Sequence, residues 1–225
     1  MRFQTEISNV TNSIARRLHT QAAIHELLAS RRSTRAFSQQ SIEPSKIMSL
    51  FEAARWSPSS ANEQPWYFIA ATKEDSLAYS ALFESLSERN RQWASNAPML
   101  VLALTQSTYS KNGQPYRHSW YDLGQSVALL SVQATALGLS VHQMGGFNPV
   151  KFVQLYPIPE GFEPVVVLAV GYPDVPESLP EDLREREQAP RSRKPLESFV
   201  FTDQWGKPSH HIHPQGPSPL RPSRN

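Results

Sequence analysis

Arginines are crowded into residues 31–37, which read RRSTRAF, although the chain of 225 residues carries a formal net charge of only +2. A planar guanidinium group can hold a phosphate through two parallel hydrogen bonds, so this spacing of arginines is typical of an anion-binding site. On this segment alone, a basic helix end that compensates the helix dipole is an equally good explanation. The candidate ligands of an anion are Arg31, Arg32, Ser33 and Arg35.

Two further stretches carry groups that suit a flat heterocyclic ligand. The polar turn SPSSANEQPW, residues 57–66, offers hydroxyl and amide groups that can read the edge of a ring. The stretch HQMGGF, residues 142–147, ends in two glycines, whose missing side chains let backbone N–H groups approach a ligand. Turn chemistry and an ordinary strand-ending bend are the alternatives. The residues concerned are Ser59, Ser60, Asn62, Gly145 and Gly146.

The composition excludes several classes of site. The chain has no cysteine, so a disulfide framework, a cysteine nucleophile, an iron–sulfur cluster and a thiolate zinc site are all excluded. With a net charge of +2, neither nucleic acid nor an anionic membrane is expected as a partner. No apolar run approaches the roughly 18 residues that cross a bilayer, and we predict a soluble, cytoplasmic protein. Residues 1–18 favour an amphipathic arm over an organellar transit peptide.

Motifs of other enzyme classes are incomplete. The chain contains neither G-x-G-x-x-G nor G-K-[ST], so the common nucleotide-binding loops are not indicated. The stretch HELLA lacks the second histidine of a zinc-protease helix, and GQSVA lacks the last glycine of a nucleophile elbow. Three clustered histidines could bind a metal, but within a proline-rich stretch a solvated spacer is the better interpretation. They are His210, His211 and His213.

The elements around these candidates can be predicted from periodicity. A helix is predicted over residues 22–30, and a second from Pro44 to the SPSS turn, with apolar residues at helical spacing. Strands are predicted at residues 66–72 and 98–105. One helix is predicted between them, and its apolar face consists of Leu82, Phe83, Leu86 and Trp93.

In the second half of the sequence, the apolar pattern predicts a long central helix at residues 120–137 that is buried on nearly all sides. A strand then runs from residue 140 into the Gly-Gly bend, and a short helix at 149–156 leads to a strand at 164–172. The charged, proline-rich stretch after Pro173 is predicted to be an arm. Strands alternating with helices indicate one α/β or α+β domain. Small residues that permit close approach to the central helix are Gly124, Ser126 and Ala128.

Taken in the order in which they occur along the chain, the sequence stretches described above resemble those of the nitroreductase family of flavoproteins over residues 22–202. RRSTR and PSSANEQPW carry most of the resemblance, and DLGQSVALLSVQATALGL, PEGFEPVVVLAVGYP and RKPLESFV extend it. The resemblance implies FMN as cofactor and an α+β fold whose central mixed or antiparallel sheet is flanked by helices. It also implies an intertwined homodimer with two active sites at its interface. The parts would be an N-terminal arm (1–21), the FMN-binding domain (22–202) and a Pro/His-rich tail (203–225).

The resemblance also assigns roles to the candidate residues. FMN carries a phosphate and its ring gains negative charge on reduction, so cations are needed at both ends of the cofactor. The implied contacts with the phosphate or ribityl chain come from Arg31, Arg32 and Ser33, and a contact with the pyrimidine side comes from Arg35. A second phosphate clamp is implied for Arg193 and Arg191. Main-chain contact with flavin N5 is implied for Gly145 and Gly146. The resemblance implies that the flavin ring is bordered, from the other subunit, by Ser59, Ser60 and Asn62. Whether Asn90 contacts the flavin stays open.

On this resemblance the chain is an NAD(P)H-dependent oxidoreductase with no obligatory acid–base residue. A nicotinamide delivers hydride to flavin N5 and leaves, and a small oxidised acceptor, such as a nitroaromatic or a quinone, then receives the electrons. The loop at residues 107–120 is expected to gate the acceptor, through Tyr109, Tyr116 and Trp120. The choice between NADH and NADPH and the identity of the physiological acceptor stay open. The alternatives are a dehalogenase, dehydrogenase or flavin-consuming enzyme on the same frame, or a non-catalytic FMN-binding dimer.

Overall fold

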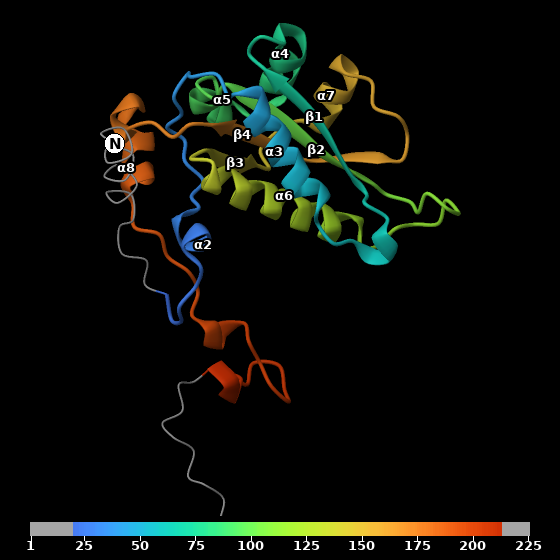
Figure 1. The fold of residues 1–225 in the computed structure, drawn as a ribbon, viewed down its shortest axis with the longest axis vertical. Helices are drawn as coiled ribbons and strands as arrows, with labels where there is room; N and C mark the ends of the chain where they lie inside the picture. Colours follow the sequence, from blue (N-terminus) through green and yellow to red (C-terminus); the bar gives the residue numbers. More distant parts are fainter. Residues whose placement is uncertain (1–19, 213–225) are drawn as a thin grey trace, which may run out of the picture. The chain divides into compact units, whose positions relative to one another are not determined.

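Figure 1 shows the fold as a computed structural model, which describes residues 20–212. These residues fall into a compact unit, residues 25–189, and a second unit formed by the segments before and after it. Residues 1–19 of the predicted arm and residues 213–225 of the predicted tail, including His213, lie outside the described residues.

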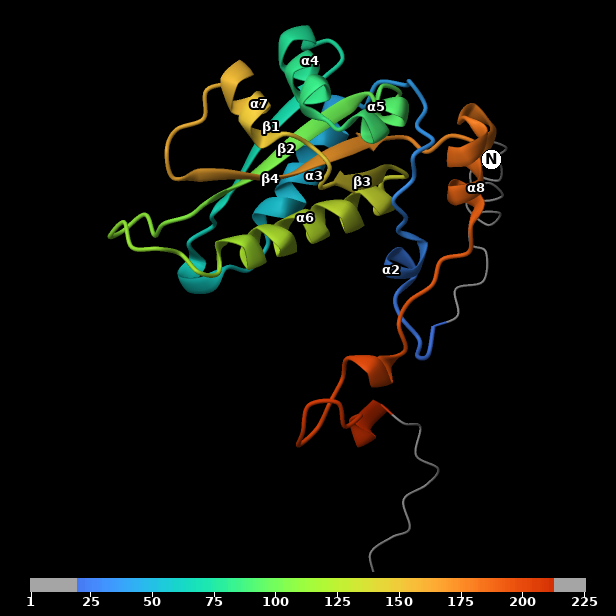
Figure 2. The same cartoon turned by 180° about the vertical axis from the view of Figure 1, so that it is seen from behind.

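A four-stranded antiparallel sheet is the centre of the compact unit (Figures 1 and 2). Its order is β1-β2-β4-β3, so β2 and β4 are the central strands, and the seven residues from Met99 to Thr105 of β2 are buried. The predicted strands are confirmed, and the sheet is antiparallel rather than mixed. The bounds are β1 Trp66–Thr72, β2 Met99–Gln106, β3 Ser140–Met144 and β4 Phe162–Gly171.

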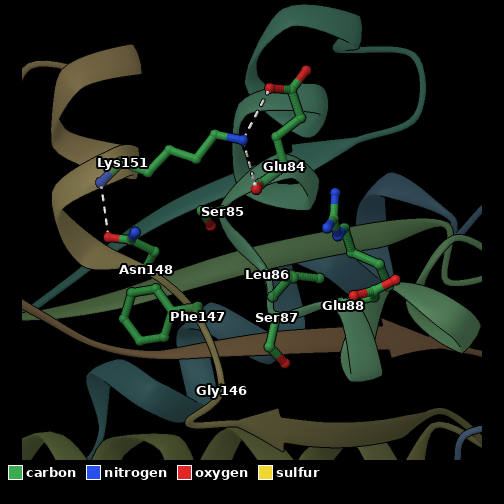
Figure 3. Close-up of a pocket in the computed structure, with 10 residues that line it drawn as sticks. Glu84, Ser85, Leu86, Ser87, Glu88, Gly146, Phe147, Asn148 and Lys151 are labelled. Atoms are coloured by element: carbon green, nitrogen blue, oxygen red, sulfur yellow. Dashed lines mark hydrogen bonds and ion pairs between the residues drawn. The ribbon is translucent and has the colours of Figure 1, made fainter.

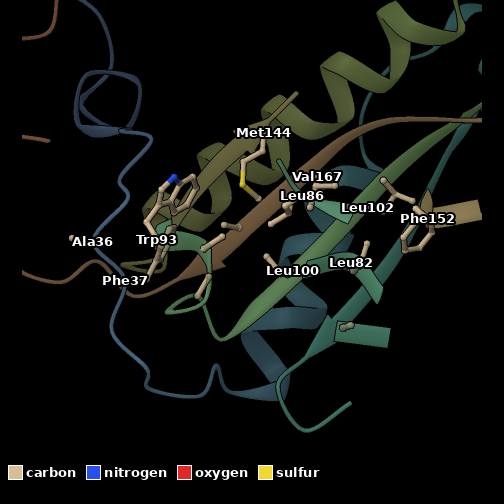
Figure 4. Packing of buried hydrophobic residues seen from close by; sticks show 14 of the residues in the cluster. Ala36, Phe37, Leu82, Leu86, Trp93, Leu100, Leu102, Met144, Phe152 and Val167 are labelled. Carbon is tan, nitrogen blue, oxygen red and sulfur yellow. The ribbon is translucent and has the colours of Figure 1, made fainter. Parts of the chain in front are cut away.

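Two hydrophobic cores lie on opposite faces of this sheet, because successive side chains of a strand point to opposite sides. Leu100 and Leu102 of β2 join the core beneath α4, α5 and α7 (Figure 4). Met99 and Val101 join the core beneath α3 and α6. The unit is therefore an α+β sandwich, as predicted. The helix bounds are α3 Pro44–Arg55, α4 Ser76–Ser85, α5 Glu88–Ala94, α6 Ser119–Ala136 and α7 Pro149–Leu155.

The prediction of a single helix between β1 and β2 is wrong. The chain leaves the helical conformation at Leu86, whose backbone is extended (φ −65°, ψ 148°), and Leu86 forms a β-bridge with Phe147. The result is two short helices, α4 and α5. Their apolar residues are still buried in one core, because both helices pack on the same face of the sheet.

Two other boundaries differ from the prediction. The helix before the arginines is α2, Glu26–Ser30, which is shorter than the predicted residues 22–30. The stretch after Pro173 is more than an arm, because it contains α8, Glu181–Gln188. This helix buries Leu183 and Glu187 and belongs to the compact unit. A leucine among seven polar residues is a weak periodic signal, so the sequence pattern did not indicate a packed helix.

Helix α6 is buried on one face only, which corrects the predicted all-round burial. Leu123 and Val127 are no more than 2% exposed, whereas Leu129 on the other face is 38% exposed. A Cβ atom added to Gly124 would meet no atom within 4 Å. The Ser126 hydroxyl donates to the Ala54 carbonyl at 3.1 Å, so this small residue serves the packing of α6 on α3. The residues exposed on the outer face are Tyr121, Gly124, Ala128 and Leu129.

The second unit joins the two ends of the described chain. The Gln21 side-chain amide accepts a hydrogen bond from the Leu196 N–H at 2.7 Å and donates to the Glu197 carboxylate at 3.2 Å. Two short 3₁₀ turns, Leu196–Ser198 and His210–Ile212, belong to this unit. Residues 20–212 hold no group of three potential metal ligands. Within the same range, no helix has the length and apolar character to traverse a bilayer.

Gly171 ends β4 where two rigid rings cover the sheet. A Cβ atom there would lie 2.5 Å from Pro98 Cδ and 3.1 Å from Phe37 Cδ1. We therefore expect Gly171→Ala to lower the free energy of unfolding by about 2 kcal/mol, a usual result of overpacking, in urea titrations of the apoprotein. Gly145→Ala is the matched control, because its Cβ would meet nothing within 4 Å. Equal losses in both variants would contradict the steric explanation.

Candidate functional site

The arginine segment, residues 31–37, leads into the end of the sheet. Phe37 forms a β-bridge with Pro173, just after β4, and the Asp174 N–H donates to the Ala36 carbonyl at 2.9 Å. The Phe37 ring is stacked on Trp93 of α5 with centroids 6.2 Å apart. These backbone and ring contacts fix the C-terminal end of the segment, so its arginines are presented from a defined backbone.

A buried carboxylate from α8 binds the same segment. Glu187 is 5% exposed, and its two oxygens accept hydrogen bonds from the Thr34 hydroxyl at 2.7 Å and the Arg35 N–H at 3.0 Å. Its oxygens also lie 3.5 Å from Arg32 Nε and 3.9 Å from Arg35 Nη1. Glu187 therefore holds both the backbone and the charges of the segment. Sequence reasoning missed it, because nothing in EDLREREQ distinguishes Glu187 from its charged neighbours.

The segment still carries an excess of positive charge. Burial lowers the pKa of Arg35, and the nearby cations of Arg186, Arg89 and Arg32 act in the same direction, whereas Glu187 opposes them. Arg32 and Arg35 thus share one buried carboxylate, and the cations of Arg186 and Arg89 add to the positive charge around Arg35. Because a guanidinium group stays protonated at neutral pH even so, this region attracts an anion.

His142 of β3 connects the arginine segment to the sheet. Its Nδ1 lies 2.9 Å from the Thr34 carbonyl oxygen, which can only accept, so Nδ1 carries the proton in the neutral ring. The ring packs against Trp93 with centroids 4.4 Å apart. The segment, α5 and β3 therefore meet at this histidine.

Protonation of His142 should destabilise the fold. Burial lowers the pKa of His142, with the nearby Arg35 cation adding to the effect and the Thr34 carbonyl opposing it. The unfolded chain then takes up the proton first, so stability is retained above about pH 6.5 and is lost as the pH falls, by at most about 1.4 kcal/mol per pH unit. We expect urea titrations between about pH 7.5 and 5.5 to show a smaller loss in His142→Gln than in the natural chain. Equal losses would show that another group is responsible.

The two glycines of the bend after β3 have different roles. The Gly146 carbonyl accepts hydrogen bonds from the Ser87 N–H and from Asn90 Nδ2, each at 2.9 Å. A Cβ atom at Gly146 would lie 2.9 Å from Ser87 Oγ, whereas a Cβ atom at Gly145 would meet nothing within 4 Å. Gly146 is therefore needed for packing on α5, and Gly145 is the position that leaves space. Asn90, whose role was open, is placed directly at the bend.

A depression of about 470 Å³ is lined by Gly146, Phe147 and Asn148 at the bend and by Ser87 of the facing segment. It lies between the α4–α5 junction and the start of α7 (Figure 3). Lys151 reaches across it, with Nζ 3.5 Å from the Glu84 carboxylate and 3.0 Å from the Glu84 carbonyl oxygen. This lysine is thus already paired with Glu84.

The SPSSANEQPW turn lies at the start of α6. Ser59 Oγ accepts a hydrogen bond from the Gln64 N–H at 3.0 Å, and the Ser60 N–H donates to Asp122 Oδ2 at 3.1 Å. The Tyr116 hydroxyl donates to the same carboxylate oxygen. Residues 59–64, called the polar turn below, are therefore fixed by α6 and by the loop before it.

The loop before α6 is a short hairpin that carries Tyr109 and Tyr116, whereas Trp120, predicted at the end of the loop at residues 107–120, lies in the first turn of α6. Thr108 and Pro115 form a β-bridge, and the rings of Tyr109 and Tyr116 lie 4.3 Å apart. Tyr116 is only 3% exposed, whereas Trp120 is 56% exposed and donates from Nε1 to Glu163 at 2.9 Å. Of the predicted contacts, Trp120 is therefore the most accessible in this chain. Its role as a substrate contact stays a prediction, as do the roles of Tyr109 and Tyr116.

One chain does not bring all the predicted site residues together. The polar turn is bonded to the first turn of α6, whereas α2, which leads into the arginine segment, lies toward the other end of this helix (Figures 1 and 2). With 18 residues, α6 is about 27 Å long. Arg31 donates to Ser33 Oγ at 3.5 Å within the segment. Arg191 and Arg193 belong to the second unit, so their predicted clamp stays a prediction.

The fold and the site define a class of α+β protein with an antiparallel sheet, a cationic segment held by β3 and α5, and a glycine bend at the end of β3 that also contacts α5. The profile of the nitroreductase family matches residues 28–172. The chain belongs to this family, as the sequence motifs predicted.

Three known proteins are similar to this chain in sequence or in structure. A crystal structure described as an oxidoreductase containing FMN has 32% sequence identity and a TM-score of 0.78, over 83% of this chain and 95% of its own. A protein of Stenotrophomonas maltophilia, named as a predicted NADH dehydrogenase/NAD(P)H nitroreductase, is 25% identical over 68% of this chain and 86% of its own length. An uncharacterised 15.4 kDa protein of Mycolicibacterium smegmatis is 31% identical over 55% of this chain and 82% of its own.

Proposed function

We propose that this protein is an FMN-dependent oxidoreductase that takes hydride from NADH or NADPH and reduces a small oxidised acceptor, such as a nitroaromatic or a quinone. The observation that carries the proposal is the cationic arginine segment, in which the guanidinium groups of Arg32 and Arg35 share the buried Glu187 carboxylate. The FMN in the similar oxidoreductase structure and the name of the Stenotrophomonas protein support it.

The residues present fit FMN chemically. A phosphate dianion matches the excess positive charge of the arginine segment, and the open space at Gly145 allows a flat group to approach the backbone. When bound, FMN supplies the redox chemistry. The phosphate and ribityl contacts would come from Arg31, Arg32 and Ser33, with Arg35 at the ring.

The protein's own residues bind and orient in this proposal. Glu187 holds Arg32 and Arg35 in place, and the guanidinium charges persist at neutral pH, so the site stays cationic when the bound cofactor gains negative charge. The Asn90 amide fixes the Gly146 carbonyl and so restrains the bend. The hairpin with Tyr109 and Tyr116, together with Trp120 in the first turn of α6, would select the acceptor.

A homodimer completes this site. The outer face of α6 exposes Tyr121, Ala128 and Leu129 around Gly124, an apolar stripe where a second helix can approach closely. In a two-fold dimer that packs α6 antiparallel on its copy, the start of one helix meets the end of the other. The polar turn of one subunit would then face the arginine segment of its partner.

The visible spectrum of the purified protein tests the proposal. A yellow protein that is bleached by NADH or NADPH without oxygen, and regains its colour with a nitroaromatic or a quinone, is the expected result. A yellow protein inert to both nicotinamides would instead favour a non-catalytic FMN-binding dimer. A colourless protein that cannot be reconstituted with FMN would overturn the proposal.

A further inference from the structure

We infer that Asp122 is a positioning residue of the flavin site, and that it acts on the partner subunit's site by holding the polar turn in shape. The inference rests on the proposed function. Asp122 begins the stretch DLGQSVALLSVQATALGL that extends the family resemblance, but no role was assigned to it, and it does not belong to the arginine segment or the glycine bend.

The polar turn has a backbone that needs an external restraint. Ala61, Asn62 and Gln64 have φ values of +55°, +54° and +54°, in the left-handed region that residues with a side chain rarely adopt. Each such residue costs about 1 kcal/mol, and asparagine tolerates the conformation best. The contacts around the turn must therefore offset this cost.

Asp122 supplies the central contact. Its Oδ2 accepts the Ser60 N–H at 3.1 Å and the Tyr116 O–H, and its Oδ1 accepts Gln125 Nε2 at 3.3 Å. Asp122 is 2% exposed and Tyr116 is 3% exposed, so water does not compete for these bonds. Burial raises the pKa of Tyr116, and its hydrogen bond to Asp122 raises it further, so the phenol stays protonated and keeps donating.

The same group of contacts ties the turn to the hairpin. The Tyr116 hydroxyl lies 3.1 Å from the Ser60 carbonyl oxygen, and the Ser110 N–H donates to the Glu63 carboxylate at 2.5 Å. Asp122 also lies in the first turn of α6, where the helix dipole stabilises a carboxylate. One buried group thus sets the positions of both segments that would border the partner's flavin.

Replacing Asp122 by alanine removes both its hydrogen bonds and its charge, whereas replacing it by asparagine removes only the charge. We expect Asp122→Ala to weaken FMN binding at least tenfold, measured by quenching of flavin fluorescence, because the turn loses its anchor. Asp122→Asn should stay within about threefold of the natural chain, since its amide oxygen can accept the same donors and Gln125 can turn its amide around. Unchanged affinity in Asp122→Ala would overturn the inference and leave the proposed function intact.

Two further variants test whether a loss of FMN binding comes from the restraint on the polar turn rather than from a general loss of folding. Asp75→Ala removes a carboxylate that accepts the Thr72 N–H at 3.0 Å in an unrelated turn, and it should leave FMN affinity unchanged. Tyr116→Phe keeps the ring and removes only the hydroxyl, so it should weaken FMN binding severalfold even if Asp122→Ala does not fold. FMN binding by Tyr116→Phe as tight as in the natural chain would count against the restraint.

Mixed dimers decide on which subunit Asp122 acts. A dimer of one Asp122→Ala chain and one Arg35→Ala chain, purified through two different tags, should contain one site with both changes and one site with neither. It should therefore bind FMN tightly at half the content of the natural dimer. If Asp122 acts within its own chain, both sites carry one change and no tight site remains. A natural chain that fails to bind FMN would instead refute the proposed function.

Discussion

Replacing Arg31 and Arg35 together by alanine should weaken FMN binding by about three orders of magnitude. Each charge-assisted hydrogen bond contributes about 1.5 to 3 kcal/mol, and the two guanidinium groups would serve one anionic ligand. Glu187 would also lose one of its two ion-pair partners, Arg35, so the segment would carry less positive charge to offset this carboxylate. The measurement is a titration of the apoprotein with FMN, followed by flavin fluorescence.

The control for this double variant has the same change of charge. Arg55 and Lys207 each form an exposed ion pair, with Glu52 at 2.5 Å and with Asp203 at 2.8 Å. Arg55→Ala combined with Lys207→Ala should bind FMN like the natural chain. If the Arg31 and Arg35 variant folds and retains FMN equally well, the assignment of the arginine segment to the cofactor fails.

Leu129→Glu should turn the proposed dimer into a monomer and thereby remove FMN. Two-fold symmetry would bury two carboxylates at once, and a penalty of about 2 kcal/mol for each raises the dissociation constant of the dimer about a thousandfold. Sedimentation or light scattering measures the mass, and the visible spectrum measures the bound flavin.

The same substitution on another face is the control. Leu77 on α4 is 88% exposed, compared with 38% for Leu129, so Leu77→Glu places a carboxylate in water. This variant should keep both the dimer and FMN. A Leu129→Glu protein that remains dimeric would show that the outer face of α6 is not the interface.

Much of the fold was predictable because its signals are local. The apolar run of β2 and the periodic apolar residues of α3 and α6 identify buried elements without knowledge of their neighbours. The break at Leu86 was not predictable in this way. Its extended backbone is stabilised by a bridge to Phe147, which lies 61 residues later in the chain, so a long-range contact overrides a continuous helical pattern.

The candidate site shows the same division. Motif positions indicated the arginine segment, the polar turn and the glycine bend, and the structure places each beside elements that hold it. The partners that hold them were not predictable. Glu187 is 153 residues from Thr34, and Asp122 is 62 residues from Ser60.

The sequence by itself determined the family, the strands, most of the helices and the residue types that suit an anionic, flat cofactor. Only the tertiary structure decided which carboxylates hold the arginine segment and the polar turn, and which face of α6 is left for a partner. The reason is physical. Periodicity and turn chemistry act within a few residues, whereas the pairing of a buried charge depends on which distant elements pack together.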